Sequence, residues 1–298
     1  MASKLYSLLA LTCLLLPLFS FAVLAYPNRQ TTSSPFEFLS KLKGFEKGNT
    51  AEEISQLRKY LNRFGYLSNN NIQTQDVNAF DDNISSAIKA YQTFFNLKPT
   101  GTLDAETVSK MMAPRCGVPD IRMHGNNKTN LDYAFFPYKP RWAPEQFSLT
   151  YAFPPDVTFF RAYVMAPVAS AFETWRSVFP NFTFTLIKDF EEADLKISFQ
   201  KRDHGDGDPF DGAGGVLAHS FEPTDGRCHL DVEENWVVGA VADGFDIGSI
   251  ALHEIGHLLG LAHTSVQNVV MYPFFSPGMT KLDLSEDDRQ GIKALYSS

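Results

Sequence analysis

The run HEIGHLLGLAH at positions 253–263 constrains the chain more than any other segment. His253 and His257 stand four residues apart, so on a helix they project from the same face, one turn above the other. Two imidazoles placed in this way can bind one Zn²⁺ at about 2.0–2.1 Å each. Gly260 permits the helix to end in a left-handed turn, which would bring His263 back as a third ligand. The run therefore predicts a helix that ends at a metal centre.

Glu254 lies beside the two histidines but points in another direction around the helix, so it cannot bind the same ion. It can instead accept a proton from a water molecule whose pKa the metal lowers to about 7. Three protein ligands leave a fourth position open, which distinguishes a catalytic zinc site from a structural one. A chance match on an amphipathic helix could explain an isolated HExxH, but not the added glycine and third histidine. We therefore expect an enzyme with Glu254 as its general base.

The segment PRCGVPD at 114–120 places Cys116 between prolines. A thiolate is a strong zinc ligand, and once bound it would fill the open position and exclude water. The alternative is a disulfide between Cys116 and Cys228, the usual arrangement of a cysteine pair in a secreted protein. The context of Cys116 favours the metal. Cys228 is then expected to be an inert, half-buried thiol, with a redox role as the lesser alternative.

The N-terminus has the pattern of a secretory signal peptide. Lys4 supplies a positive charge, positions 8–24 are almost all apolar, and Val-Leu-Ala at 23–25 ends on small residues. We expect cleavage after Ala25, with an uncleaved membrane anchor as the alternative. No later segment approaches the ~20 apolar residues of a membrane span. The sequence predicts a protein of the extracellular space or of the cell wall and apoplast, not held in a membrane.

Size and composition set further limits. At 298 residues the chain has room for two compact units. A net charge of −8 argues against a nucleic-acid binder, which needs a basic surface. We expect a monomer without nucleic-acid partners. Three glycosylation sequons, at Asn83, Asn127 and Asn181, fit a secretory route.

Residues 48–113 have the pattern of a small helical unit. Thr50 and Glu53 have capping-box spacing, and Gly65 marks the end of the first helix. Three apolar faces follow in order: Ile54, Leu57, Leu61 and Phe64; Ile84, Ile88, Tyr91 and Phe94; and Val108 and Met111 on a short helix that begins at Asp104. A proline- and glycine-rich connector at 114–144 is expected to be exposed and cleavable.

The remainder alternates between strand and helix patterns. Strands are expected at 149–153, 182–188, 194–200, 216–221 and 228–233, and helices before 179, at 245–261 and at 285–296. This order predicts an α/β (α+β) fold with one mixed sheet and three helices, preceded by the small all-α unit.

The histidine run and the later segment Val270-Met271-Tyr272-Pro273 resemble the metzincin signature and Met-turn of the matrixins, the matrix metalloproteinases. The resemblance implies that Met271 forms a hydrophobic floor under the zinc. Tyr272 and Pro273 would line the pocket for the substrate side chain just after the scissile bond. PRCGVPD resembles the matrixin cysteine switch, in which Arg115 and Asp120 would pair. Thr264 is a departure, because matrixins usually have serine there.

Two more metal sites follow from the resemblance. One is a closed structural zinc site formed by nitrogen and oxygen ligands: His204, Asp206, His219 and His229. The other is a calcium site of carboxylates and backbone carbonyls: Asp211, Gly212, Gly214, Val216, Asp231 and Glu234. An acidic, glycine-rich loop that merely turns is the alternative for the second group. The expected cofactors are two Zn²⁺ and at least one Ca²⁺.

The resemblance also implies a division of the chain. Residues 1–25 would be the signal peptide, 26–132 the propeptide with a peptidoglycan-binding-like domain at 48–113, and 133–298 the catalytic domain. Without a haemopexin domain, this layout resembles plant matrixins. Aligning on Pro140-Arg141-Trp142 places the mature terminus at Tyr133.

We therefore expect a secreted zinc endopeptidase made as a cysteine-switch zymogen. An extended substrate would add as a strand along 215–218, against Leu217 and Ala218. A non-catalytic wall-binding module is the rival, but such a scaffold would have no need of Glu254.

Overall fold

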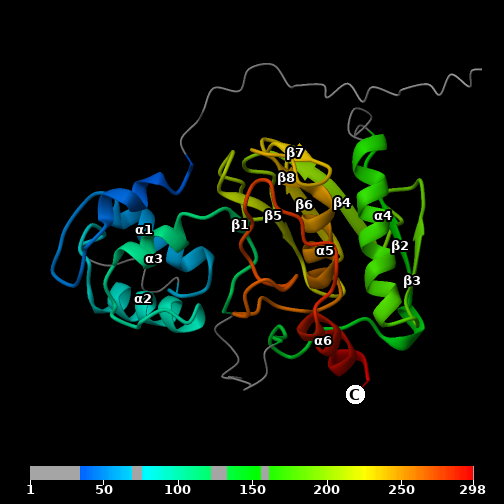
Figure 1. The fold of residues 1–298 in the computed structure, drawn as a ribbon, viewed down its shortest axis with the longest axis horizontal. Coiled ribbons are helices and arrows are strands. Elements are labelled where there is room, and N and C mark those ends of the chain that lie inside the picture. Colours follow the sequence, from blue (N-terminus) through cyan, green and yellow to red (C-terminus); the bar gives the residue numbers. More distant parts are fainter. Residues whose placement is uncertain (1–33, 69–75, 122–132, 156–160, 298) are drawn as a thin grey trace, which may run out of the picture. The chain divides into compact units, whose positions relative to one another are not determined.

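The computed structural model describes residues 34–68, 76–121, 133–155 and 161–297. The predicted signal peptide and the sequon at Asn127 lie outside these residues. The described chain begins with a helical part and continues into a larger part built on a sheet (Figure 1). Among the described helices, none is both long and apolar enough to cross a membrane.

The helical part contains the three predicted α-helices and a preceding 3₁₀ helix. They are η1 (Glu37–Leu42), α1 (Ile54–Arg63), α2 (Asp82–Phe94) and α3 (Ala105–Met111). Asp81 caps α2 by accepting a hydrogen bond from the N–H of Ile84, and Asp104 caps α3 in the same way from Thr107. The apolar faces meet in one buried core, with Phe94 partly buried at its margin.

The predicted capping box at the start of α1 is wrong. The helix begins at Ile54, and Glu53, its N-cap, makes no side-chain cap. Thr50 instead forms an isolated antiparallel bridge with Ala79, and the Glu53 carboxylate accepts a hydrogen bond from Lys41 at 2.9 Å. Because the backbone at Thr50 is engaged by this bridge, it cannot lead the helix. The predicted stop holds, since Gly65 has a φ of +85° directly after the C-cap.

The larger part contains a six-stranded mixed sheet in the order β1-β5-β6-β4-β2-β3. Its strands are β1 (Arg115–Cys116), β2 (Ser148–Ala152), β3 (Thr183–Leu186), β4 (Leu195–Gln200), β5 (Val216–Ser220) and β6 (Arg227–Asp231). Only the β5–β6 pair is antiparallel. Two short strands, β7 (Trp236–Val237) and β8 (Phe245–Asp246), form a separate ribbon. The mixed sheet and all five predicted strands are confirmed, whereas β1, β7 and β8 were not predicted.

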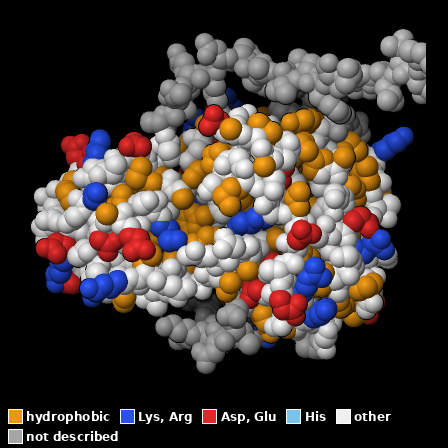
Figure 2. Space-filling model, in the orientation of Figure 1, with side chains coloured by type: hydrophobic (Ala, Val, Ile, Leu, Met, Phe, Trp, Pro, Cys, Tyr) orange, Lys and Arg blue, Asp and Glu red, His pale blue; other side chains and the backbone are white. Residues whose placement is uncertain are grey.

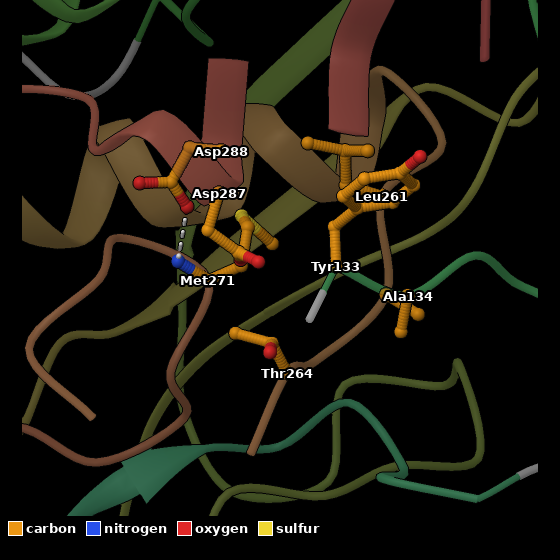
Figure 3. Close-up of a pocket in the computed structure, with 8 residues that line it drawn as sticks. Tyr133, Ala134, Leu261, Thr264, Met271, Asp287 and Asp288 are labelled. Atoms are coloured by element: carbon orange, nitrogen blue, oxygen red, sulfur yellow. Dashed lines mark hydrogen bonds between the residues drawn. The ribbon is translucent and has the colours of Figure 1, made fainter. Parts of the chain in front are cut away.

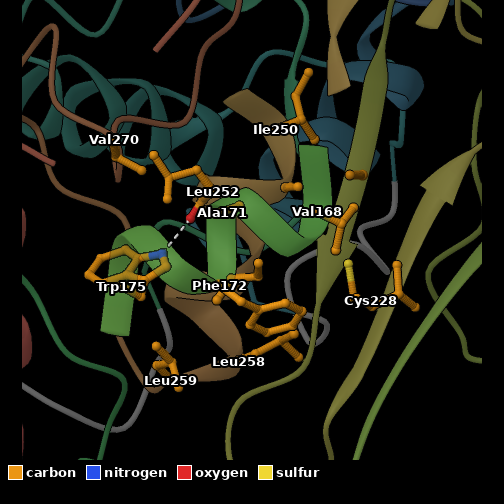
Figure 4. Close-up of a cluster of buried hydrophobic side chains, with 14 of the residues drawn as sticks. Val168, Ala171, Phe172, Trp175, Cys228, Ile250, Leu252, Leu258, Leu259 and Val270 are labelled. Atoms are coloured by element: carbon orange, nitrogen blue, oxygen red, sulfur yellow. Dashed lines mark hydrogen bonds between the residues drawn. The ribbon is translucent and has the colours of Figure 1, made fainter. Parts of the chain in front are cut away.

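Three helices accompany the sheet, as predicted: α4 (Arg161–Val178), α5 (Ile247–Leu258) and α6 (Glu286–Tyr296). Helix α5 packs against α4 on one side and against β5 and β6 on the other. Trp175 links α4 to α5, because its buried indole N–H donates to the carbonyl of Leu252 at 2.8 Å (Figure 4). Every residue of α5 is buried, so the polar groups on it must find their partners inside the protein.

The connector prediction is wrong for residues 114–120. Arg115 and Cys116 are fully buried, and β1 adds to the sheet as a parallel partner of β5. The N–H of Arg115 donates to Gly215 at 3.0 Å, and the N–H of Gly117 donates to Ala218 at 2.8 Å. A side chain at position 117 would collide with Val216, so this close approach requires glycine. The backbone groups at the edge of β5 would otherwise be unpaired, so their hydrogen bonds to β1 keep this segment in the sheet.

The visible surface carries charged side chains of both signs, interspersed with apolar ones (Figure 2). The acidic excess of the sequence therefore does not gather into one patch on this face.

Candidate active site

The three histidines of the C-terminal run point their Nε2 atoms at one another. The Nε2 atom of His253 lies 3.1 Å from that of His257 and 3.2 Å from that of His263, and the third distance is also 3.2 Å. A tetrahedral ion bound at about 2.0–2.1 Å would hold such nitrogens ~3.3 Å apart. The spacing therefore fits a zinc ion.

Hydrogen bonds to the other ring nitrogens fix the tautomers. The Nδ1 atom of His253 lies 2.7 Å from the carbonyl of Val270, and that of His257 lies 2.8 Å from the carbonyl of Leu261. A carbonyl only accepts, so both Nδ1 atoms carry the proton and both Nε2 atoms present lone pairs. Burial also lowers the pKa of His253, which keeps the ring neutral. Facing lone pairs in a buried site need a cation between them.

The turn at the C-terminal end of α5 places His263 next to His253 and His257. The N–H of Leu261 donates to Gly256 and that of Gly260 to His257, which together form a Schellman motif. Gly260 has a φ of +96°, as the left-handed turn requires. Met271 packs directly against α5, because a side chain at Gly256 would collide with its sulfur. The predicted helix end is confirmed.

Cys116, which lies far from the three histidines in the sequence, is the fourth member of this cluster. Its Sγ lies 3.6 Å from Nε2 of His257, and the four ligand atoms of Cys116 and the three histidines all lie within 4.8 Å of one another. Burial raises the pKa of the thiol, and the charge of Glu254 raises it further. A bound cation would reverse this preference and favour the thiolate. The donor set fits zinc.

Asp120 joins the cysteine segment to a histidine of the cluster. Its Oδ1 pairs with Arg115 at 2.5 Å and lies 2.8 Å from Nδ1 of His263, and its Oδ2 accepts a hydrogen bond from Tyr66 at 2.8 Å. Burial acts to raise the pKa of Asp120, but the charge of Arg115 and the bond to His263 outweigh it and lower that pKa. The predicted Arg115–Asp120 pair is present. The link to His263 was not predicted, because the two residues are 143 positions apart.

Glu254 is fully buried and stands beside the cluster rather than in it. Its Oε2 accepts a hydrogen bond from the hydroxyl of Ser220 at 2.8 Å. Burial raises the pKa of Glu254 to about 7. A carboxylate with such a pKa can exchange protons near neutral pH, as a general base must.

A second cluster forms around Asp206. Its Oδ2 lies 2.8 Å from Nε2 of His204, 2.7 Å from Nε2 of His219 and 2.9 Å from Nδ1 of His229. Nδ1 of His204 lies 2.8 Å from the carbonyl of Arg202, so its Nε2 presents a lone pair to the carboxylate oxygen. Burial, with the neighbouring His219, lowers the pKa of His229 to about 4. Three ring nitrogens and a carboxylate oxygen that converge in this way fit a closed zinc site, as predicted.

These geometries agree with the comparisons with known proteins. The Matrixin family model matches residues 141–297, and a peptidoglycan binding domain model matches residues 50–111. The chain is 39% identical over 295 residues to Metalloendoproteinase 2-MMP of Arabidopsis thaliana, covering 91% of this chain and 77% of that protein. It is 42% identical over 266 residues to Metalloendoproteinase 1 of Glycine max, covering 86% of each.

The chain is a matrixin. It is also 36% identical over 261 residues to human neutrophil collagenase, covering 85% of this chain and 52% of that protein. As a member of this family it is a zinc metalloendopeptidase, and its cysteine and histidine cluster is that of a cysteine switch.

In this matrixin, the helical part also covers the predicted substrate side. The edge of β5 expected to receive substrate is occupied by β1, and the carbonyl of Pro273 accepts a hydrogen bond from the N–H of Cys116 at 2.9 Å. The hydroxyl of Tyr272 accepts a hydrogen bond from Lys110 of α3 at 2.8 Å. Leu217, predicted as substrate-facing, is fully buried within β5. These contacts were not predicted, because they depend on how the two parts pack.

The loop predicted to bind calcium is partly held by its own carboxylates. Asp211 accepts a hydrogen bond from the N–H of Val216 at 2.9 Å, and Glu234 accepts one from Gly214 at 2.7 Å. Gly212 turns the loop with a φ of +94°. Oδ2 of Asp231 is buried and has no hydrogen-bond partner in the described chain, and burial raises the pKa of Asp231 to about 6. An orphaned carboxylate oxygen of this kind fits a bound cation.

The disulfide alternative is excluded, because Cys116 and Cys228 are both free thiols. Cys228 is buried, at 3% exposure, rather than half-buried as expected. It lies on β6 against the core of the sheet, where burial and the charge of Glu254 raise the pKa of its thiol. The thiol therefore stays neutral, which fits the inert role that the sequence indicates.

Proposed function

We propose that this matrixin is a secreted zymogen whose catalytic zinc is blocked by Cys116 until the propeptide is removed. One observation carries the proposal: the sulfur of Cys116 lies in the same four-atom cluster as Nε2 of His253, His257 and His263. A ligand in the open position leaves no room for the reacting water. The proposed propeptide is 26–132, after a signal peptide at 1–25, and the proposed catalytic domain is 133–298.

Each residue of the site has a proposed role. His253, His257 and His263 would hold the zinc ion, which when bound polarises the scissile carbonyl and acidifies the attacking water. Glu254 accepts the proton of that water and then donates it to the leaving amine. Met271 packs beneath the histidines. Tyr272 and Pro273 line the pocket for the side chain that follows the scissile bond.

The proposed substrates are extended segments of extracellular proteins. Such a segment adds to the edge of β5 at Leu217 and Ala218 by backbone hydrogen bonds. The N–H of Gly117 already uses the carbonyl of Ala218, which supports the view that this edge accepts a strand. Inhibitor and substrate thus compete for the same groups, so the enzyme is active only after the propeptide leaves.

Two further ions would stabilise the catalytic domain. A structural zinc would be held by His204, Asp206, His219 and His229, whose ligand atoms lie close together. A calcium ion would be held by Asp211, Asp231 and Glu234 with the carbonyls of Gly212, Gly214 and Val216. The buried, unpaired oxygen of Asp231 supports this second site.

Replacing Cys116 with Ser tests the proposal. The full-length variant should cleave a peptide without prior activation, because a neutral hydroxyl is a much weaker zinc ligand than a thiolate. A mercurial reagent should activate the wild-type proform and add nothing to the variant. Cys228→Ser serves as the control, since that thiol stands apart from the metal cluster, and it should remain latent. A latent Cys116→Ser proform would show that steric cover alone causes inhibition.

A further inference from the structure

A buried hydroxyl group of the adjacent strand β5 contacts Glu254. Ser220, the last residue of β5, donates a hydrogen bond from Oγ to Oε2 of Glu254 at 2.8 Å. Ser220 is 3% exposed and Glu254 is fully buried. This bond joins the strand edge proposed to bind substrate to the proposed general base.

We propose that Ser220 is a positioning residue, whose hydroxyl holds Oε2 of Glu254 so that Oε1 is the oxygen that exchanges protons with the reacting water. The inference rests on the proposed role of Glu254 as general base. It assigns a role in the reaction to a residue outside the histidine run and the cysteine switch.

The two oxygens of Glu254 are not equivalent in the structure. Oε2 is held by Ser220, whereas Oε1 is buried and makes no hydrogen bond to a nitrogen or oxygen donor of the described chain. The thiol of Cys116, which belongs to the metal cluster in this state, interacts with the Glu254 carboxylate. Release of Cys116 would remove this neighbour, while the bond from Ser220 stays in place.

A restraint on the carboxylate of Glu254 limits its rotation. The terminal torsion of a glutamate is broad and roughly two-fold, so an unrestrained carboxylate can rotate and exchange its oxygens. A hydrogen bond from a hydroxyl to a carboxylate is charge-assisted, and burial removes competition from water. The bond from Ser220 therefore favours one rotamer of Glu254 throughout the proton transfers.

The supports of this bond are themselves rigid. Ser220 pairs with Cys228 across the antiparallel β5–β6 ladder, and Glu254 lies in the middle of the fully buried α5. The thiol of Cys228 is neutral, since burial raises its pKa. The acceptor of the Ser220 hydroxyl is therefore Oε2 of Glu254, at 2.8 Å. Small errors in the placement of a catalytic group can cost ~10²-fold in rate, so a fixed donor here affects turnover.

A matched pair of variants isolates the hydroxyl. Ser220→Thr keeps the donor, and Ser220→Val has nearly the same shape as Thr without it, while both suit a strand. Each full-length variant is expressed, activated, and assayed for kcat and KM on one peptide, with zinc content and melting temperature measured in parallel. Ser198→Ala, which removes another buried serine hydroxyl from β4, a strand separated from β5 by β6, is the control.

We expect Ser220→Val to lose kcat by ~10-fold or more, the usual effect of removing a hydrogen bond to a buried charged group. KM should change by less than ~2-fold, because the lost contact acts on the chemical step and not on substrate binding. Ser220→Thr should keep most of the wild-type kcat, and Ser198→Ala should match wild type. Zinc content should stay constant across the set.

Two results would overturn the inference. One is a Ser220→Val enzyme with wild-type kcat, and the other is a loss of kcat that comes with a matching loss of zinc or of thermal stability. Glu254→Gln separates the inference from the proposed mechanism. If Glu254→Gln is inactive while Ser220→Val is fully active, only the role of Ser220 fails. If Glu254→Gln turns over like wild type, the proposed base fails, and the role of Ser220 fails with it.

Discussion

At the scale of single residues, Asp120 does more than the sequence pattern indicates. One buried carboxylate pairs with Arg115, contacts the ring of His263 and accepts a hydrogen bond from Tyr66. The guanidinium of Arg115 in turn lies 3.7 Å from the ring centre of Phe64 in the helical part. The cysteine loop is therefore anchored on both the metal cluster and the core of the helical part.

Removing the charge of Asp120 should weaken latency. Asp120→Asn leaves Arg115 buried without its partner, and breaking a buried pair in this way costs about 3–5 kcal/mol. In the intact zymogen, Cys116 should then react with a thiol reagent at least ~10-fold faster than in the wild-type protein. Mass spectrometry of labelled peptides would measure the rate at Cys116, with Cys228 as the internal control.

The mature enzyme provides a second control for Asp120→Asn. If the proposed cut precedes Tyr133, the wild-type and variant zymogens yield the same mature chain. Their specific activities after full activation should therefore be equal. A zymogen variant labelled no faster than wild type would show that the ion pair does not hold the loop.

At the scale of elements, the accuracy of the sequence-based predictions depends on how local each feature is. The spacing of His253 and His257 and the glycine at 260 describe one helix and its end, so the pattern alone predicts both. The contact between Ser220 and Glu254 needs β5 to stack on α5, and the contact between Asp120 and His263 needs two parts of the chain to pack. Neither contact can be predicted from the spacing of residues within one helix or strand. The capping box at Thr50 failed for the related reason that a distant bridge to Ala79 overrides a local preference.

Asp231, the last residue of β6, provides an electrostatic prediction. Burial raises the pKa of Asp231 from 3.8 to about 6. A carboxyl group with a raised pKa binds its proton more tightly in the folded state. Its contribution therefore favours folding below about pH 4 and is lost as the pH rises to about 6. Above that range the calcium-free protein contains a buried, uncompensated charge.

Asp231→Asn should therefore stabilise the calcium-free protein at pH 7.5 by ~1–3 kcal/mol. We expect calcium to raise the melting temperature of the wild-type protein, since an ion bound only to the folded state stabilises it by mass action, and the same change should remove that rise. Denaturant unfolding with and without added calcium measures both effects. The exposed Asp283→Asn should behave like wild type, and a variant less stable without calcium would contradict the account.

At the scale of the whole molecule, activation should reorganise the segment that begins at Tyr133. Residues 133–135 already run beside the end of the histidine run, because the carbonyl of Ala134 accepts a hydrogen bond from the N–H of Ala262 and Phe135 bridges to Leu261. Tyr133 and Asp287 line one small pocket (Figure 3). The neighbouring Asp288 already accepts hydrogen bonds from Val270, Met271 and Ser285. We propose Asp287, which lines this pocket together with Tyr133, as the partner of the new N-terminal ammonium.

Asp287→Asn should reduce the activity of enzyme that starts at Tyr133, because it removes the partner of the ammonium and loosens a segment packed beside His263. It should hardly affect enzyme that starts a few residues later, where no ammonium reaches the pocket. A partly buried pair of this kind is worth more than the ~0–1 kcal/mol of an exposed one, so a loss of several-fold in kcat is expected. N-terminal sequencing of both preparations is essential, and an active enzyme that starts beyond Trp142 would refute the assignment.

The parallel pairing of β1 with β5 also means that latency depends on the effective concentration of the Cys116 thiol at the zinc site. Because Cys116 is tethered to the chain that it inhibits, its thiol competes with substrate at a fixed local concentration, of the order of mM or above for a short tether. Dilution of the zymogen does not release it, and ordinary substrate levels do not displace it. The proposed single cut between Asp120 and Tyr133 would turn this intramolecular ligand into a separate chain at the concentration of the protein itself. The same backbone hydrogen bonds would then hold a ligand that can diffuse away, so one hydrolysed bond would make activation irreversible.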